Sequence, residues 1–174
     1  RRRSLKYVTA FNCRSNINGG ALGDGTLTTR LSPVQITTDV VGMAGGGSGG
    51  DDHSIFVRSD GSVWTMGGNS KGQLGDGTQN ARLIPVQIAS GGSSVAAHDQ
   101  HSLFVRTDGT LWGMGDNQWG QLGDGTLIDR PNPVQVATGV RLVATGTYHT
   151  LFLKADATLW AMGGNGYGQY YLGT

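Results

Sequence analysis

Three histidines stand at equivalent positions of the chain and could in principle hold a metal ion. His53, His101 and His149 follow one another at intervals of 48 residues. Three imidazoles are a common ligand set for zinc. Regular spacing, however, places such residues in successive structural units rather than around one ion. We therefore predict a structural hydrogen bond for each histidine at the start of a strand, and no metal site.

Aspartates in a glycine-rich motif are the next candidates, for calcium. Asp24, Asp76 and Asp124 each lie in the sequence Leu-Gly-Asp-Gly-Thr, which lacks the alternating carboxylates of a calcium loop. Capping of a turn by the aspartate side chain is the simpler interpretation. The chain also contains no glutamate, and no Walker, zinc-spacing or Ser/His/Asp signature is present. The sequence predicts a protein that is not an enzyme and uses no cofactor.

A glycine tract at 45–50 matches two short motifs, a dinucleotide fingerprint and a nucleophile elbow. Both mechanisms need a helix directly after the loop, either to offer its amides to a phosphate or to hold a strained serine. Here Asp51 and Asp52 lead into a predicted strand instead. We interpret the tract as an inserted loop.

The composition limits which elements can position these residues. Of 174 residues 31 are glycine and only three are lysine, so the residues that usually cover helix surfaces are scarce. A formal net charge of +1 does not indicate nucleic-acid binding. No apolar run approaches the roughly 20 residues that span a bilayer. The single cysteine, Cys13, cannot form an internal disulfide and therefore does not indicate the cellular compartment of the protein. We predict an all-β chain with no nucleic-acid partner and no membrane span.

An internal repeat dominates the sequence. Its landmarks recur at intervals of 48 residues, except that the first interval is 52 because of four extra residues between Pro33 and His53. Such a period indicates that each copy is one structural unit. The landmarks are Trp64, Trp112 and Trp160; Phe56, Phe104 and Phe152; Met66, Met114 and Met162; Pro33, Pro85 and Pro133; and Leu-Gly-Asp-Gly-Thr at 22–26, 74–78 and 122–126.

Each copy contains a predicted β-hairpin. Residues 101–107 and 110–115 are β-rich apolar runs that flank an Asp-Gly pair at 108–109. This pair favours a two-residue turn with positive φ at both positions. The third copy has Asp-Ala at 156–157, and because alanine is strained at positive φ, we expect another turn type there.

Two further runs bring each copy to four strands. They lie at 94–97, before the hairpin, and at 133–136, after it. Four short antiparallel strands in 40 to 50 residues are typical of one propeller blade. The predicted fold is a partial β-propeller of about three to four four-stranded antiparallel blades, in which Trp64, Trp112 and Trp160 pack in the core.

The motifs of one copy resemble those of a known repeat family. The chain contains Trp-x-Met-Gly-x-Asn-x-x-Gly-Gln-Leu-Gly-Asp-Gly-Thr, followed by Arg-x-x-Pro-Val-Gln and Ala-x-x-x-x-His-Ser-Leu-Phe-Val. This pattern is similar to the regulator-of-chromosome-condensation repeat in its bacterial form, over about residues 16–174. The resemblance implies a propeller, typically of seven blades, that serves mainly as a platform for binding other proteins.

The repeat sets the expected domain organisation. A basic segment, 1–15, precedes the repeat segment, 16–174, whose landmark copies lie at 22–35, 53–87, 101–135 and 149–174. Fewer blades than a full ring leave an apolar face and unpaired strand edges at each end. We expect these ends to be completed by the rest of a longer chain or by another copy of the same chain, as a homo-oligomer.

Positions that differ between copies are free to specify a partner. Aromatic residues at such loop positions are candidate anchors because they often dominate protein interfaces. The predicted partner-binding residues are Trp119, Tyr167, Asp51, Asp52, Asp99 and Tyr148.

These observations favour a non-enzymatic protein-binding scaffold that presents variable loops on a rigid propeller. Two alternatives remain open. One is regulation of a small GTPase by nucleotide exchange, as in the eukaryotic founder of the family. The other is a purely structural unit that self-assembles through its open blade edges.

Overall fold

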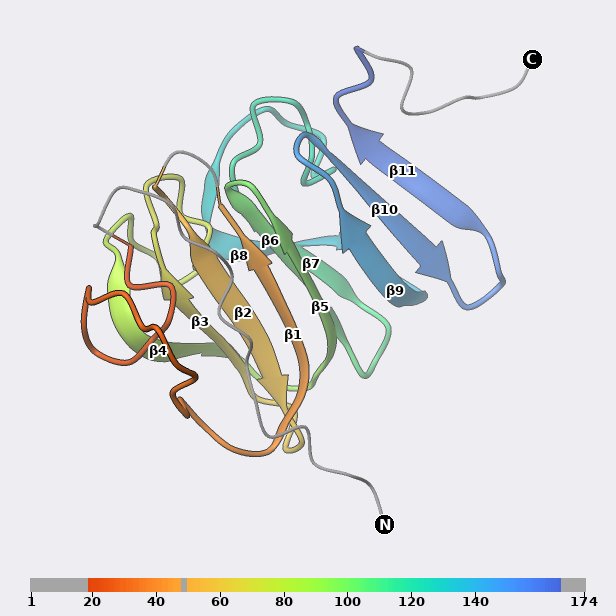
Figure 1. Ribbon diagram of the computed structural model, residues 1–174. Coiled ribbons are helices and arrows are strands. Elements are labelled where there is room, and N and C mark those ends of the chain that lie inside the picture. Colours follow the sequence, from red (N-terminus) through yellow and green to blue (C-terminus); the bar gives the residue numbers. More distant parts are fainter. Residues whose placement is uncertain (1–18, 48–49, 167–174) are drawn as a thin grey trace.

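The computed structural model describes residues 19–47 and 50–166, and these form three antiparallel sheets that lie side by side (Figure 1). We call the sheets blades 1, 2 and 3. In each blade, strands that follow one another in sequence also pair with one another. Blade 1 consists of β1 (Val40–Gly46), β2 (His53–Arg58), β3 (Val63–Gly67) and β4 (Arg82–Ala89). Blade 2 consists of β5 (Gly92–His98), β6 (His101–Arg106), β7 (Leu111–Gly115) and β8 (Arg130–Ala137), and blade 3 of β9 (Val140–Thr145), β10 (His149–Lys154) and β11 (Leu159–Gly163).

The architecture confirms the predicted all-β fold with four strands per repeat, complete in blades 1 and 2. Blade 3 has three strands in the described part of the chain. Residues 30–37 resemble β4 and β8 in sequence but are not part of a sheet. Their expected pairing partner falls before residue 19, outside the described residues, as does the predicted segment 1–15.

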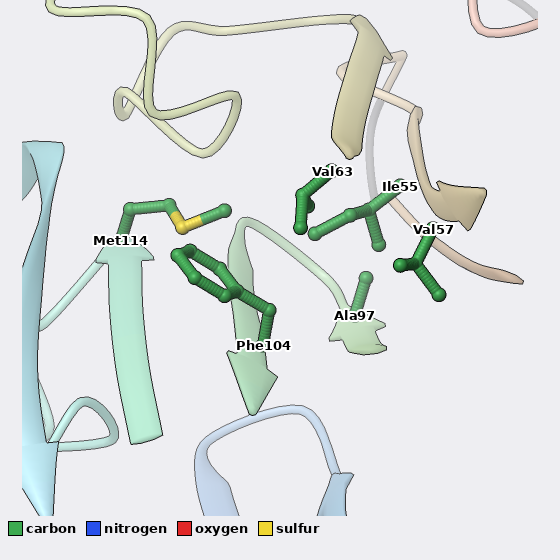
Figure 2. Packing of buried hydrophobic residues seen from close by; sticks show 6 residues of the cluster. All are labelled: Ile55, Val57, Val63, Ala97, Phe104 and Met114. Atoms are coloured by element: carbon green, nitrogen blue, oxygen red, sulfur yellow. The ribbon is translucent and has the colours of Figure 1, made fainter. Parts of the chain in front are cut away.

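Successive blades pack face to face around apolar side chains. Because successive side chains of a strand point to opposite faces of the sheet, each face of a blade carries apolar side chains that can contact a neighbouring blade. Figure 2 shows the core between blades 1 and 2, where Ile55, Val57 and Val63 meet Ala97, Phe104 and Met114. The core between blades 2 and 3 contains Leu103, Val105, Leu111, Val140 and Phe152.

Blade 3 shows what happens when this face has no neighbour. Val63 and Leu111 are equivalent residues of blades 1 and 2, and both are 0% exposed. Their counterpart Leu159 is 69% exposed, and Leu142 on β9 is 55% exposed. The outer face of blade 3 is therefore an uncovered apolar surface among the described residues.

The hairpin turns differ from the predicted two-residue type. Gly61 N–H donates to the Arg58 carbonyl, and Arg58 N–H donates to the Ser62 carbonyl, both at 2.9 Å. Only Gly61 of this turn has positive φ, 81°. This is a three-residue loop in which a type I turn is followed by a left-handed residue. The prediction missed it because the Asp60 carboxylate binds Ser62, which favours the type I turn.

The expectation of another turn type in the third copy was also wrong. Ala157 takes φ of 67°, close to the 82° of its counterpart Gly109, and makes the same hydrogen bond back across the turn. Alanine is strained in this region, so the rest of the hairpin holds it there. Asp156 contributes by accepting two hydrogen bonds from Thr158.

Candidate functional site

The variable residues gather at one edge of the blades, which we call the rim. In an antiparallel meander, the turn before β6 and the loop after β7 come at the same end of the sheet. The rim therefore contains equivalent connections from all three blades. In the described residues they are 47 and 50–52, 99–100 and 146–148 between the first and second strands, and 68–81 and 116–129 after the third strand.

A repeated ion pair fixes the long rim loops. Asp76 accepts hydrogen bonds from the Thr78 backbone and hydroxyl, and Arg82 Nε donates to its other oxygen at 2.6 Å. Burial raises the pKa of Asp76, but the hydrogen bonds from Thr78 and Arg82 outweigh it, so the pKa lies below its usual value. Asp24–Arg30 and Asp124–Arg130 repeat the ion pair. The aspartates are turn caps, as the sequence predicted.

Sequence reasoning missed a buried asparagine at the centre of each loop. Asn69 and Asn117 are 1% and 0% exposed. The Asn117 amide nitrogen donates to the Thr126 carbonyl at 3.0 Å, while its oxygen accepts from Leu122 N–H at 3.0 Å. The signal was present in the sequence, because these asparagines also recur at an interval of 48 residues. Such satisfied polar groups give the rim a rigid base.

The histidines join neighbouring blades below the rim. His53 Nε2 lies 2.7 Å from Ser102 Oγ of blade 2, and His101 Nε2 lies 3.3 Å from Thr150 Oγ1 of blade 3. Burial lowers the pKa of His53 to about 4 and that of His101 to about 3, so both rings are neutral at pH 7. His149 is half-buried. No group of three potential ligands able to hold a metal occurs in 19–47 and 50–166.

The repeated tryptophans lie on the faces of the blades, away from the rim. Trp64 and Trp112 are partly buried, whereas Trp160 is 49% exposed because its edge of blade 3 lacks a fourth strand among the described residues. Each indole N–H donates to a Ser or Thr hydroxyl two residues earlier. Each ring is also covered by a cation of the adjacent strand, namely Arg58, Arg106 or Lys154.

At the junction of blades 1 and 2, the rim is a polar network. The Asp51 carboxylate accepts hydrogen bonds from Gln73 at 2.7 Å and from Gln100 of blade 2 at 2.8 Å. Burial raises the pKa of Asp51, but hydrogen bonds from Ser70, Gln73 and Gln100 outweigh it, so the pKa is lowered. The Asp52 carbonyl accepts from Gly68 N–H. This network ties the first connection of blade 1 to its long loop and to blade 2.

Lys71 extends the polar network to the next loop. Its Nζ lies 3.1 Å from Asp129 Oδ2 and 3.6 Å from Asp116 Oδ1. Burial raises the pKa of Asp116, and the carboxylate of Asp129 adds to that effect. Gln121 donates to the second oxygen of Asp116 at 2.5 Å. One lysine thus bridges two carboxylates of blade 2.

At the junction of blades 2 and 3, the rim is aromatic. Trp119 is 57% exposed and Tyr148 is 41% exposed, and their ring centroids lie 5.5 Å apart at 45°. Both side chains emerge beside Gly164. The structure therefore brings together two of the predicted partner-binding residues. Asp99 lies in the β5–β6 turn of blade 2, next to Gln100, and Tyr167 lies outside the described residues.

The successive antiparallel sheets and the loops that recur in them define a repeat protein of the β-propeller class. Models of the regulator of chromosome condensation (RCC1) repeat match residues 60–105 and 108–153, and a second form of the same repeat matches 93–121 and 140–169. These matches cover more than half of the chain. The protein belongs to the RCC1 repeat family, whose members are typically non-catalytic.

Solved structures show the same fold. Human WBSCR16 matches with a TM-score of 0.67 and 26% identity over 79% of this chain. Yeast RCC1 (Prp20), solved bound to Kap60, matches with a TM-score of 0.70 and 21% identity over 86% of this chain. The chain spans 36% of the length of WBSCR16 and 38% of that of Prp20. It corresponds to part of an RCC1-type propeller, and its described residues include no helix that could span a membrane.

Proposed function

We propose that this chain is a non-enzymatic protein-binding module that uses its rim as the contact surface. The exposed Trp119–Tyr148 pair carries this proposal, because it occupies rim positions that are polar in the neighbouring junction. Large aromatic side chains on a rigid support lose little conformational entropy on binding and often act as anchors.

The support beneath the pair favours this role. The Trp119 backbone N–H donates to Gln121 Oε1 at 2.9 Å, and Gln121 and Asn117 are buried and hydrogen-bonded. The loop is therefore preorganised, which lowers the entropic cost of binding a partner. Asp52, Asp99 and Tyr167 are proposed as surrounding contacts, whereas Asp51 supports the rim from within.

Capture of partner proteins tests the proposal. Immobilised wild type, W119A and Y148A are exposed to the same protein mixture, with W160A as a control that removes a half-exposed indole outside the rim. We expect a partner retained by wild type and W160A but depleted on W119A and Y148A, at unchanged melting temperatures. Equal capture by all four proteins would remove the proposed anchors.

Completion of the ring is a second proposal, supported by the uncovered leucines of blade 3. The occupant would be a further blade, from the rest of a longer chain or from another copy, since blades 2 and 3 cover the equivalent faces of blades 1 and 2. Native mass spectrometry at micromolar concentration tests whether a second copy of the chain covers this face. A mass that corresponds only to the monomer would argue against a homo-oligomer.

Nucleotide exchange on a small GTPase is the remaining candidate. Prp20p from Saccharomyces cerevisiae, whose crystal structure was described together with its binding properties to Gsp1p and histones, shares 21% identity with this chain. Such an activity would need a projecting wedge, and no insertion in the sequence exceeds four residues relative to the other copies. Acceleration in a nucleotide-release assay is expected if this candidate holds, and an unchanged rate excludes it.

A further inference from the structure

In the part of the chain that the structure describes, each of the three repeated tryptophans is covered by a cation. Arg58, Arg106 and Lys154 lie 5.0, 4.6 and 4.3 Å from the ring centroids of Trp64, Trp112 and Trp160. Within the described residues, no arginine or lysine lies over the ring of Trp119, which is the most exposed of the four. An exposed indole face is the best aromatic surface for a cation.

The charge of the rim favours a cation from outside. Asp76 and Asp124 are neutralised by their arginines, but Asp51, Asp99, Asp116 and Asp129 face only one rim cation, Lys71, among the described residues. The Lys71 ammonium is already held between two of these carboxylates. The described rim is therefore net negative, which attracts and orients a basic partner.

The acidic and aromatic parts of the rim are mechanically connected. The Gln100 carbonyl next to Asp99 accepts a hydrogen bond from Asp116 N–H at 2.8 Å, and Asp116 lies at the base of the Trp119 loop. Tyr148 packs against one side of the Trp119 ring and holds it in place. More than half of the Trp119 surface remains open to a ligand.

We propose that the rim between blades 2 and 3 binds a basic segment of a partner protein, with an arginine stacked on Trp119. Arginine fits better than lysine because its planar guanidinium stacks on an aromatic face while its N–H groups still donate to nearby oxygens. Tyr148 orients the indole, and Asp99 contributes longer-range attraction. This proposal rests on the proposed protein-binding function and specifies the chemistry of the partner.

A peptide titration tests the inference. The probe is a fluorescently labelled peptide of alternating glycine and arginine, followed by anisotropy at low ionic strength. A matched peptide carries citrulline, which keeps the planar shape but removes the charge. We expect W119A to raise the Kd about tenfold, and the citrulline peptide to bind at least that much more weakly. W119F, which keeps a ring, should lose less affinity than W119A.

The controls separate stacking from general charge attraction. W160A should leave the Kd unchanged, and D99N should raise it about twofold at low salt and less at about 0.15 M. Equal affinity of the arginine and citrulline peptides, equal losses in W119A and W160A, or no saturable binding would each overturn the inference. If the peptide fails while W119A still loses captured partner, the protein-binding function stands and only the arginine specificity is wrong.

Discussion

The two blade junctions share their interior and differ at their rim. In both, a histidine of one blade meets a hydroxyl of the next, and buried apolar side chains of the two blades pack together. At the rim, Lys71 and Trp119 occupy equivalent positions, as do Gln100 and Tyr148. Lys71 reaches the next blade through an ion pair, whereas Trp119 does so through a ring contact. One scaffold thus supports either chemistry, because the buried contacts between blades recur at both junctions.

The strongest test of this comparison removes the same buried leucine from the long loops of blades 1 and 2. Leu74 and Leu122 are equivalent, and both are 0% exposed. L74A and L122A should each lower the free energy of unfolding by about 2–5 kcal/mol through lost burial and a cavity. L159A, at a 69% exposed position, should cost less than about 1 kcal/mol. Chemical denaturation measures all three, and a negligible effect of L74A or L122A would contradict the shared interior.

Acidification should weaken both junctions through their histidines. His53 and His101 have folded-state pKa values of about 4 and about 3, well below the roughly 6.5 of an unfolded chain. Protonation therefore favours the unfolded state as pH falls below 6.5. Between pH 6.5 and 5 each histidine should cost about 2 kcal/mol of stability. Urea titrations of wild type and of H53Q/H101Q measure the effect, and an identical pH slope in the two proteins would refute it.

Removal of the repeated Asp–Arg ion pair from the long rim loops should lower the stability of the fold less than these changes. D76N and D124N remove the charged partner of Arg82 and Arg130 but keep an oxygen that can cap the turn. Each substitution should lower the free energy of unfolding by about 1–2 kcal/mol, because the hydrogen bonds that it removes are charge-assisted and the carboxylates are nearly buried. Thermal unfolding checks this, and a large difference between the variants would show that the two loops are not equivalent.

Exchange of the rim residues should change stability least. W119K/Y148Q gives the second junction the residues of the first, and both positions are exposed. We expect the free energy of unfolding to change by less than about 0.5 kcal/mol, because no core contact is removed. The melting temperature measures the outcome. A loss comparable to that of L122A would mean that the aromatic pair holds the blades together rather than serving a partner.

Sequence periodicity predicted the fold well because the contacts that define a blade recur in each copy. Met66, Met114 and Phe104 pack where the repeat places them, and Asp76 caps its loop as predicted. The turn type was wrong because local Asp–Ser and Asp–Thr hydrogen bonds compete with the intrinsic preference of an Asp-Gly pair.

The rim was only partly predictable. Trp119 and Tyr148 were both identified as variable surface residues, but their contact joins two blades and has no counterpart in the other copies. Asp51 was expected to contact a partner, yet it is engaged by Ser70, Gln73 and Gln100, which depends on how the longer connection folds back. A period reveals contacts that repeat, and it carries no information on contacts made once.

Hydrogen–deuterium exchange on a captured complex compares the two junctions directly. We expect the partner to protect residues 116–121 and 146–148, whereas residues 68–73 exchange as in the free protein. Protection confined to the junction of blades 1 and 2, or to the leucine face of blade 3, would contradict the assignment of binding to the aromatic rim.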